Sequence, residues 1–314
     1  MRQTGVAARL RGISAASSRV VWVSGTSGTV IRTDDGGRSW RVLSVPDAEK
    51  LDFRDIDAVD DRTAYILSIG PGDASRIYKT SDAGATWTLQ FRNEDANAFF
   101  DAMAFRDART GYAISDSVDG RPVIIKTGDG GVRWSRLTNA LPAALDGEGS
   151  YAASGTNVAI RDRHVWIGTS ASRVLRSTDE GRTWAVSATP LPTGTSAGIF
   201  SIAFRDPLHG IVVGGDYKKE SEAVDNVAVS GDGGVSWSLV KGAGGFRSAV
   251  AYVPSAANTV VMVGPSGSDY SSDGGRTWRA IEGPGFHTLS VPPRGREVWA
   301  AGEKGTVGKL LFGS

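Results

Sequence analysis

An eight-residue phrase ending in tryptophan occurs six times along the chain. Its copies are TDDGGRSW from residue 33, TSDAGATW from 80, TGDGGVRW from 127, STDEGRTW from 177, SGDGGVSW from 230 and SSDGGRTW from 271. The closing tryptophans recur every 41 to 53 residues. A repeat of about 40–50 residues with strand-like content is typical of a β-propeller with one four-stranded blade per repeat.

One repeat shows the expected blade clearly. Strand-like segments cover residues 53–59, 63–69 and 76–80, and a fourth segment begins at the tryptophan and covers 87–91. Short turn-forming stretches separate these segments, and no helical periodicity competes with them. The phrase therefore lies between the third and fourth strands of a blade, where a hairpin turn is required.

The residues of the phrase suit a turn. An aspartate can accept backbone N–H bonds, and a glycine supplies a positive φ. The tryptophan starts the outer strand and can bury a large surface between blades. We interpret the six copies as structural hairpin elements rather than as ligand or metal sites. Their aspartates are Asp35, Asp82, Asp129, Asp179, Asp232 and Asp273, and their tryptophans are Trp40, Trp87, Trp134, Trp184, Trp237 and Trp278.

The phrase has the form [ST]-x-D-x-G-x-[TS]-W, which is the Asp-box of the bacterial neuraminidase repeat (BNR) family. Five copies match fully, and the third has Arg133 in place of the hydroxyl residue. The strings GGDY (214–217), GPSGSD (264–269) and FRSAVA (246–251) also resemble photosystem II stability/assembly-factor-like propellers. These resemblances imply a sialidase-type propeller fold whose boxes lie on the face away from the binding site.

The two ends of the chain are predicted to share one blade. Three strand-like segments (286–291, 297–302 and 306–312) follow the sixth box, and the chain ends where a seventh box would begin. We predict that Gln3–Ala8 supplies the missing fourth strand, because a ring closed in this way has no free edge. The prediction is a single all-β domain over residues 1–314, a seven-bladed propeller, and a monomer.

Composition removes several function classes. The chain has 35 Lys and Arg against 34 Asp and Glu, so it lacks the broad basic field of a nucleic-acid protein. It has no cysteine, and its three histidines are scattered, so we expect no metal and no cofactor. No apolar run is long enough to span a bilayer. We favour an exported or periplasmic protein, its signal removed, over a cytoplasmic one.

The starts of the inner strands provide the candidate binding site. Aligning them places Arg247, His287, Arg11 and Arg54 on four contiguous blades, as a basic arc at the mouth of the channel. Phe100, Tyr151 and Phe200 form the opposing arc, and the long charged loop with Asp216 and Tyr217 lies at the same rim. A mouth of this kind suits a small anion or a carboxylate. Alternatively, the arginines pair with Asp55 and Asp101 and seal the channel.

Three functions are compatible with this pattern. The first, which we favour, is a non-catalytic binding or assembly module for a protein segment or a small anionic or carbohydrate ligand. The second is a sialidase-like or other glycoside hydrolase, in which Arg11, Arg54 and Arg247 clamp a carboxylate. Tyr151 would be its nucleophile beside Glu148, with Asp55 or Asp101 as the acid. The third is an oxidoreductase, for which the string GAGGF (242–246) lacks a dinucleotide-binding context.

Overall fold

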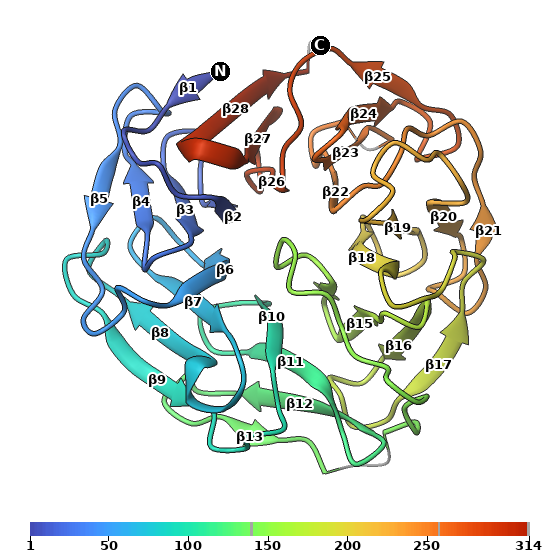
Figure 1. Ribbon diagram of the computed structural model, residues 1–314, viewed down its shortest axis with the longest axis horizontal. Coiled ribbons are helices and arrows are strands. Elements are labelled where there is room, and N and C mark those ends of the chain that lie inside the picture. Colours follow the sequence, from blue (N-terminus) through green and yellow to red (C-terminus); the bar gives the residue numbers. More distant parts are fainter. Residues whose placement is uncertain (139–140, 257, 313–314) are drawn as a thin grey trace.

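The structure is a closed ring of β-sheets (Figure 1), and the inner strands line a central channel. It is a computed structural model that describes residues 1–138, 141–256 and 258–312. Within this part of the chain there are seven sheets of four antiparallel strands each, which confirms the seven-bladed propeller. Among the described residues, no helix is long and apolar enough to cross a membrane.

Each blade is ordered from an inner strand beside the channel to an outer strand at the rim. Blade one contains β2 (Leu10–Ala15), β3 (Val21–Gly25), β4 (Val30–Thr33) and β5 (Arg41–Leu43). Blade two contains β6 (Asp52–Ala58), β7 (Ala64–Ile69), β8 (Arg76–Thr80) and β9 (Thr88–Arg92). Blade three contains β10 (Phe100–Phe105), β11 (Gly111–Val118), β12 (Arg121–Thr127) and β13 (Ser135–Arg136).

The remaining blades follow the same order. Blade four contains β14 (Val158–Arg161), β15 (His164–Gly168), β16 (Arg173–Ser177) and β17 (Ala185–Ala188). Blade five contains β18 (Ala197–Phe204), β19 (Gly210–Asp216), β20 (Val227–Ser230) and β21 (Ser238–Leu239). Blade six contains β22 (Ala249–Tyr252), β23 (Val260–Gly264), β24 (Gly267–Ser271) and β25 (Arg279–Ile281). Blade seven contains β26 (Thr288–Ser290), β27 (Glu297–Ala301), β28 (Thr306–Leu311) and β1 (Arg2–Gln3). Two single-turn 3₁₀ helices, η1 (Gly72–Ala74) and η2 (Glu303–Gly305), interrupt loops of blades two and seven.

The six phrases form the turns between third and fourth strands, as predicted, and we call them box turns. In the first, Asp35 Oδ1 accepts the N–H groups of Arg38 (2.8 Å) and Ser39 (3.0 Å), and Oδ2 accepts the Ser39 hydroxyl (2.6 Å). Thr33 Oγ1 donates to Asp35 (2.8 Å) and accepts the N–H of Gly37 (2.9 Å). The aspartate is thus occupied by the turn itself, which supports the structural interpretation.

The N-terminus closes blade seven. β1 pairs antiparallel with β28, Arg2 opposite Val307 and Gln3 opposite Thr306, and it is the outermost strand of the sheet (Figure 1). The predicted location is therefore confirmed, but the strand is shorter and begins earlier than the predicted Gln3–Ala8. The chain turns inward after Gln3, and this segment accepts the Gly305 N–H at Ala8 O (2.8 Å) instead of continuing the ladder.

Candidate functional site

Antiparallel pairing sorts the connections onto two faces of the ring. The box face carries the box turns and the turns that join the first and second strands of each blade. The mouth face carries the loops that join second to third strands and the connections between successive blades. The starts of the inner strands, where the candidate site was predicted, lie at the mouth face.

A β-bulge near the start of four inner strands determines which residues are equivalent. The register shifts fall between Leu10 and Gly12, Phe53 and Asp55, Phe100 and Ala102, and Ile199 and Ser201. The bulged residues are therefore Arg11, Arg54, Asp101 and Phe200. Bulges of this kind redirect side chains at the ends of strands.

The bulge in blade three shows that the sequence alignment of this blade was wrong by one residue. Phe100 is equivalent to Leu10 and Phe53, and not to Arg11 and Arg54. It is 1% exposed and packs in the core between blades two and three, with its ring 5.1 Å from that of Phe91. Phe100 is thus a core residue and does not form part of the mouth.

Blade four also differs from the prediction. Its inner strand begins at Val158, seven residues after Tyr151, and the preceding segment reaches into the centre of the ring (Figure 1). We call residues 151–156 the channel plug. The segment is rich in small residues and has no alternation of polar and apolar positions, so it does not form a strand.

The plug is bonded to five blades. The Nη1 atoms of Arg11 and Arg54 donate to the carbonyls of Ala153 (3.4 Å) and Ala152 (2.8 Å), which links the plug to blades one and two. Further hydrogen bonds link it to blades five, six and seven. They include Thr156 Oγ1 to Ser201 Oγ (2.7 Å), Ser154 Oγ to Ser248 O (2.7 Å) and Thr288 Oγ1 to Ser154 O (3.1 Å).

A cationic cluster stands beside the plug. Arg9 pairs with Glu303 (2.7 Å) and Arg54 pairs with Asp52 (2.9 Å), whereas Arg11 makes no ion pair with any residue that the structure describes. Arg11 Nε is buried without a hydrogen-bond partner among those residues. Burial, followed by the neighbouring Arg54 charge, lowers the pKa of Arg11 to about 10.

His287 lies next to this cluster and is neutral at pH 7. Its Nε2 lies 2.7 Å from Glu303 Oε1. Burial, followed by the Arg11 charge, lowers the pKa of His287 to about 4. Three arginines therefore face two carboxylates, and the cluster carries one excess positive charge.

Arg247 does not join the cluster. It is buried and pairs with Asp269 through Nε (2.7 Å) and Nη2 (2.6 Å), and Asp269 lies on β24, the third strand of blade six. Its Nη1 donates to Phe246 O (2.9 Å) and to Ser266 Oγ (3.2 Å). The predicted basic arc thus contains Arg11, Arg54 and His287, and the unpredicted Arg9, but not Arg247. The arginines do not form ion pairs with Asp55 or Asp101, which was the alternative considered from the sequence.

Aromatic side chains gather on the other side of the mouth. Tyr151 stacks on Phe200, with ring centroids 3.8 Å apart, and both rings make edge contacts with Tyr217, which is 42% exposed. Phe246 packs edge-on against Phe200 at 4.6 Å. Asp216 ends β19 by accepting the Lys218 N–H (2.9 Å), which positions Tyr217 at the rim. The predicted aromatic arc is present, with Phe246 in place of Phe100.

The candidate catalytic residues do not assemble a sialidase-type site. Glu148 is buried in an ion pair with Arg173 and accepts the Thr169 hydroxyl (2.6 Å). Although burial opposes it, these bonds hold the pKa of Glu148 below its usual value. Burial raises the pKa of Tyr151 to about 12, and its hydroxyl lies 3.3 Å from Ala197 O. Among the described residues, the Tyr151 hydroxyl bonds only backbone carbonyls and no carboxylate.

The two candidate acids lie in different places. Asp55 is buried beneath the plug and accepts the Met103 N–H (2.6 Å). Asp101 is 1% exposed, and its Oδ2 has no hydrogen-bond partner among the described residues. Burial raises the pKa of both carboxyls well above the usual value, and Asp116 raises that of Asp101 further.

Among the described residues, no cluster of three or more His, Asp or Glu side chains could hold a metal ion. His209 lies 2.9 Å from Asp206 on the box face, and His164 stacks against Trp166.

Arg9, Glu303 and the plug were not predicted from the sequence. The only signal for the plug was the length of the connection between the third and fourth boxes, which exceeds that of the earlier ones. Nothing local indicates that a loop of blade four bonds blades one, two, five, six and seven.

Comparison with solved structures confirms the fold. The structure "YCF48 bound to D1 peptide" matches with a TM-score of 0.71 and 17% identity, over 99% of this chain and 96% of that one. YCF48 from Cyanidioschyzon merolae matches at 0.67 and 18%, over 99% and 98%. The GH74 xyloglucanase from Xanthomonas campestris matches at 0.70 and 14%, over 98% of this chain and 53% of that one. No protein-family model and no curated protein matches this chain.

Proposed function

We propose that this propeller is a non-catalytic binding module that holds an acidic protein segment at its mouth face. Arg11 carries the proposal. It is a half-buried guanidinium without an ion pair, beside two other arginines, in a cluster with one excess positive charge. A carboxylate placed there gains a charge-assisted hydrogen bond and neutralises the excess.

The aromatic side of the mouth supports a protein segment as the ligand. Exposed Tyr217 and the stacked pair of Tyr151 and Phe200 offer an apolar surface that suits a side chain next to the bound carboxylate. A propeller of the same fold, YCF48, has been solved with a D1 peptide bound. The BNR-like box turns take no part, because their aspartates are occupied by their own turns and lie on the opposite face.

The test begins with labelled peptides that combine Asp or Glu with an aromatic residue, selected for binding by fluorescence anisotropy. We expect Arg11→Gln to weaken the selected peptide at least about tenfold, as loss of a buried ionic contact does, and Arg11→Lys to restore part of the affinity. Arg163→Gln, at an exposed arginine on the box face, is the matched control. Selection of peptides without acidic residues, or equal binding by Arg11→Gln, would overturn the proposal.

Glycoside hydrolysis is a second candidate because Asp101 and Asp116 place two interacting carboxyl groups near Arg54 at the mouth. GH74 enzymes share the fold, although this chain spans about half the length of the matched xyloglucanase. Incubation with a sialoside and a panel of aryl glycosides tests this candidate. Turnover that is abolished by Asp101→Asn or Tyr151→Phe would place hydrolysis ahead of binding.

A further inference from the structure

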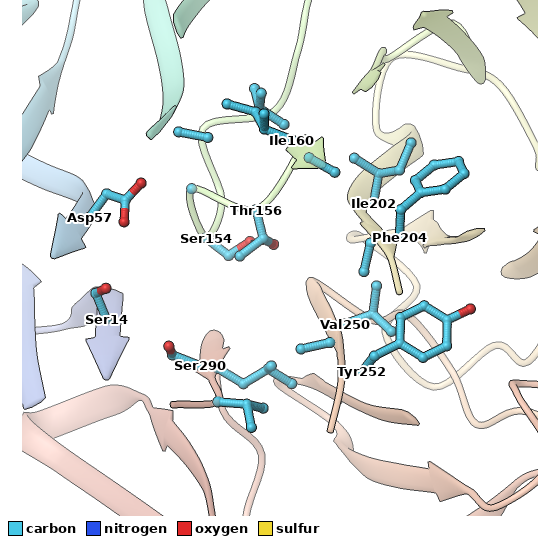
Figure 2. Close-up of a pocket in the computed structure, with 18 of the residues that line it drawn as sticks. Ser14, Asp57, Ser154, Thr156, Ile160, Ile202, Phe204, Val250, Tyr252 and Ser290 are labelled. Carbon is cyan, nitrogen blue, oxygen red and sulfur yellow. The ribbon is translucent and has the colours of Figure 1, made fainter. Parts of the chain in front are cut away.

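A second cavity lies in the central channel, on the box-face side of the plug (Figure 2). Its volume is about 830 Å³, and it extends from Ser154 and Thr156 of the plug to the exposed Arg161 and Pro254 at the box face. Ligand pockets typically enclose about 300–1,000 Å³. The plug therefore makes the channel a blind cavity of the right size for a small molecule, separate from the mouth.

One wall of this cavity is apolar. Ile160 of blade four, Ile202 and Phe204 of blade five, and Val250 and Tyr252 of blade six line it together (Figure 2). Ile202 and Phe204 also pack in the core between blades four and five, and Val250 and Tyr252 in the core between blades five and six. The wall is therefore the channel-side edge of these two cores. The apolar part of a ligand is stabilised when it leaves water and packs against this surface.

The opposite wall is polar. Ser14 and Ser290 of blades one and seven present hydroxyl groups (Figure 2). Each hydroxyl oxygen accepts one backbone N–H from the next blade, Ala58 for Ser14 and Ala15 for Ser290, both at 3.0 Å. A hydroxyl oxygen that accepts one bond still has a second lone pair with which it can accept a hydrogen bond from an ammonium group. The two serines can therefore contribute hydrogen bonds to a ligand without losing their structural contacts.

Asp57 supplies the charge in this wall. Its Oδ2 accepts the Phe105 N–H (2.6 Å), and its carboxylate points toward the cavity (Figure 2). Among the described residues, no cation pairs with Asp57, and its second oxygen has no partner. Burial raises the pKa of this carboxyl to about 6. An unpaired carboxylate in a partly desolvated cavity is stabilised by an incoming cation.

From this geometry we infer that the blind channel cavity binds a small organic amine with an apolar body. The ammonium group pairs with Asp57 and reaches the hydroxyls of Ser14 or Ser290. The body of the ligand lies against Phe204, Val250 and the rest of the apolar wall. Neutral molecules of the same shape gain only the apolar contact, and carboxylates are repelled by Asp57.

The probes are 2-phenylethylamine, the neutral 2-phenylethanol and the anionic 3-phenylpropionate, titrated into the full chain by ligand-observed NMR and calorimetry. We expect the amine to bind most tightly and the carboxylate not to bind. Asp57→Asn removes the charge while keeping the shape, and it should weaken the amine at least tenfold and leave 2-phenylethanol unchanged. The far-ultraviolet circular dichroism spectrum verifies that this variant is folded.

Asp61→Asn is the matched control, because Asp61 is an exposed aspartate of the same blade at the same face. It should leave all three affinities unchanged. Arg11→Gln, which acts at the mouth, should also leave amine binding unchanged, so the two sites are tested separately. Absence of amine binding at millimolar concentration, or equal amine affinity in wild type and Asp57→Asn, would overturn the inference.

Discussion

At the scale of single residues, each box turn is stabilised by the hydrogen bonds that its aspartate accepts. Hydrogen bonds from the hydroxyl and N–H of Thr86 and of Ser236 lower the pKa of Asp82 and of Asp232 to about 2. Asp129 accepts the Arg133 N–H (2.9 Å) and the Thr127 hydroxyl (2.9 Å), but Arg133 has no hydroxyl to add. The third box turn therefore lacks one charge-assisted bond that the other five have.

Arg133→Thr should supply that bond and stabilise the protein. The new hydroxyl can donate to Asp129 as Thr86 does to Asp82 (2.6 Å), and Arg133 is exposed and makes no ion pair with the residues that the structure describes. We expect the melting temperature to rise by about 1–3 °C, measured by calorimetry. Thr86→Arg, which imitates the third turn in the second, should lower it. An unchanged melting temperature in both variants would contradict this account.

At the scale of elements, the packing between neighbouring blades depends on the box tryptophans. We call the contact region between two neighbouring blades a seam, and a box tryptophan fills six of the seven seams. Each tryptophan packs with the core shared by its own blade and the preceding one, as Trp87 does against Trp22 at 6.1 Å and Trp40 against Trp299 at 6.3 Å. Blade seven has no box, because β1 is its outer strand. The seam between blades six and seven accordingly holds an apolar cavity of about 220 Å³.

Ser268→Val should strengthen this weaker seam. Ser268 lines the cavity, and its buried Oγ has no hydrogen-bond partner in the described part of the chain. Valine removes the unsatisfied hydroxyl, adds apolar volume and suits a strand. We expect a gain of about 1 kcal/mol in unfolding free energy, measured by urea denaturation.

Ser68→Val is the control for that substitution. Ser68 is also buried on a strand, but its Oγ donates to Ala74 O (2.6 Å) and accepts the Arg76 N–H (3.1 Å). Removing these bonds should destabilise the protein. Destabilisation by both substitutions would show that the seam has no space to fill.

At the scale of the whole molecule, the plug divides the channel into a mouth and a blind cavity. Five blades hold it, so its conformation depends on the closed ring rather than on blade four alone. Gly155 of the plug has no room for a side chain. It has a φ of +71°, and a Cβ there would lie 2.2 Å from Asp55 Oδ1.

Gly155→Ala should therefore be more damaging than a similar change elsewhere. Gly147 has a comparable φ of +67°, but a Cβ there would meet nothing within 4 Å. The left-handed backbone costs about 1 kcal/mol at either site, and the clash should add about 1–3 kcal/mol at Gly155 alone. Urea denaturation of Gly155→Ala and Gly147→Ala measures the difference. Equal losses would mean that the plug is not held against Asp55.

Much of the fold is predictable because its determinants are local. The box turns need only an aspartate, a glycine and a hydroxyl within eight residues, and their spacing gives the blade length. The strands at 76–80 and 306–311 follow from alternation and from the turns that bound them. The role of β1 followed from counting strands at the C-terminus, although its length depends on where the chain turns toward Gly305.

The site was predicted only in part because it depends on register. Arg11, Arg54, Phe200 and Tyr217 lie at the mouth, where the sequence alignment placed them, and their role in binding stays a prediction. Phe100 was misplaced because a bulge shifts blade three by one residue, and a shift of one residue moves a side chain to the other face of a strand. Arg247 was misplaced because a partner two strands away, Asp269, holds it in the blade.

The repeated phrase by itself determined that this chain folds as a ring of blades, because short-range turn chemistry and strand alternation are written within each repeat. Only the tertiary structure decided what the ring encloses. The plug, the unpaired Arg11 and the blind cavity facing Asp57 arise where residues from distant repeats meet at the axis. Their contacts depend on ring closure and bulge register, and no single repeat encodes either.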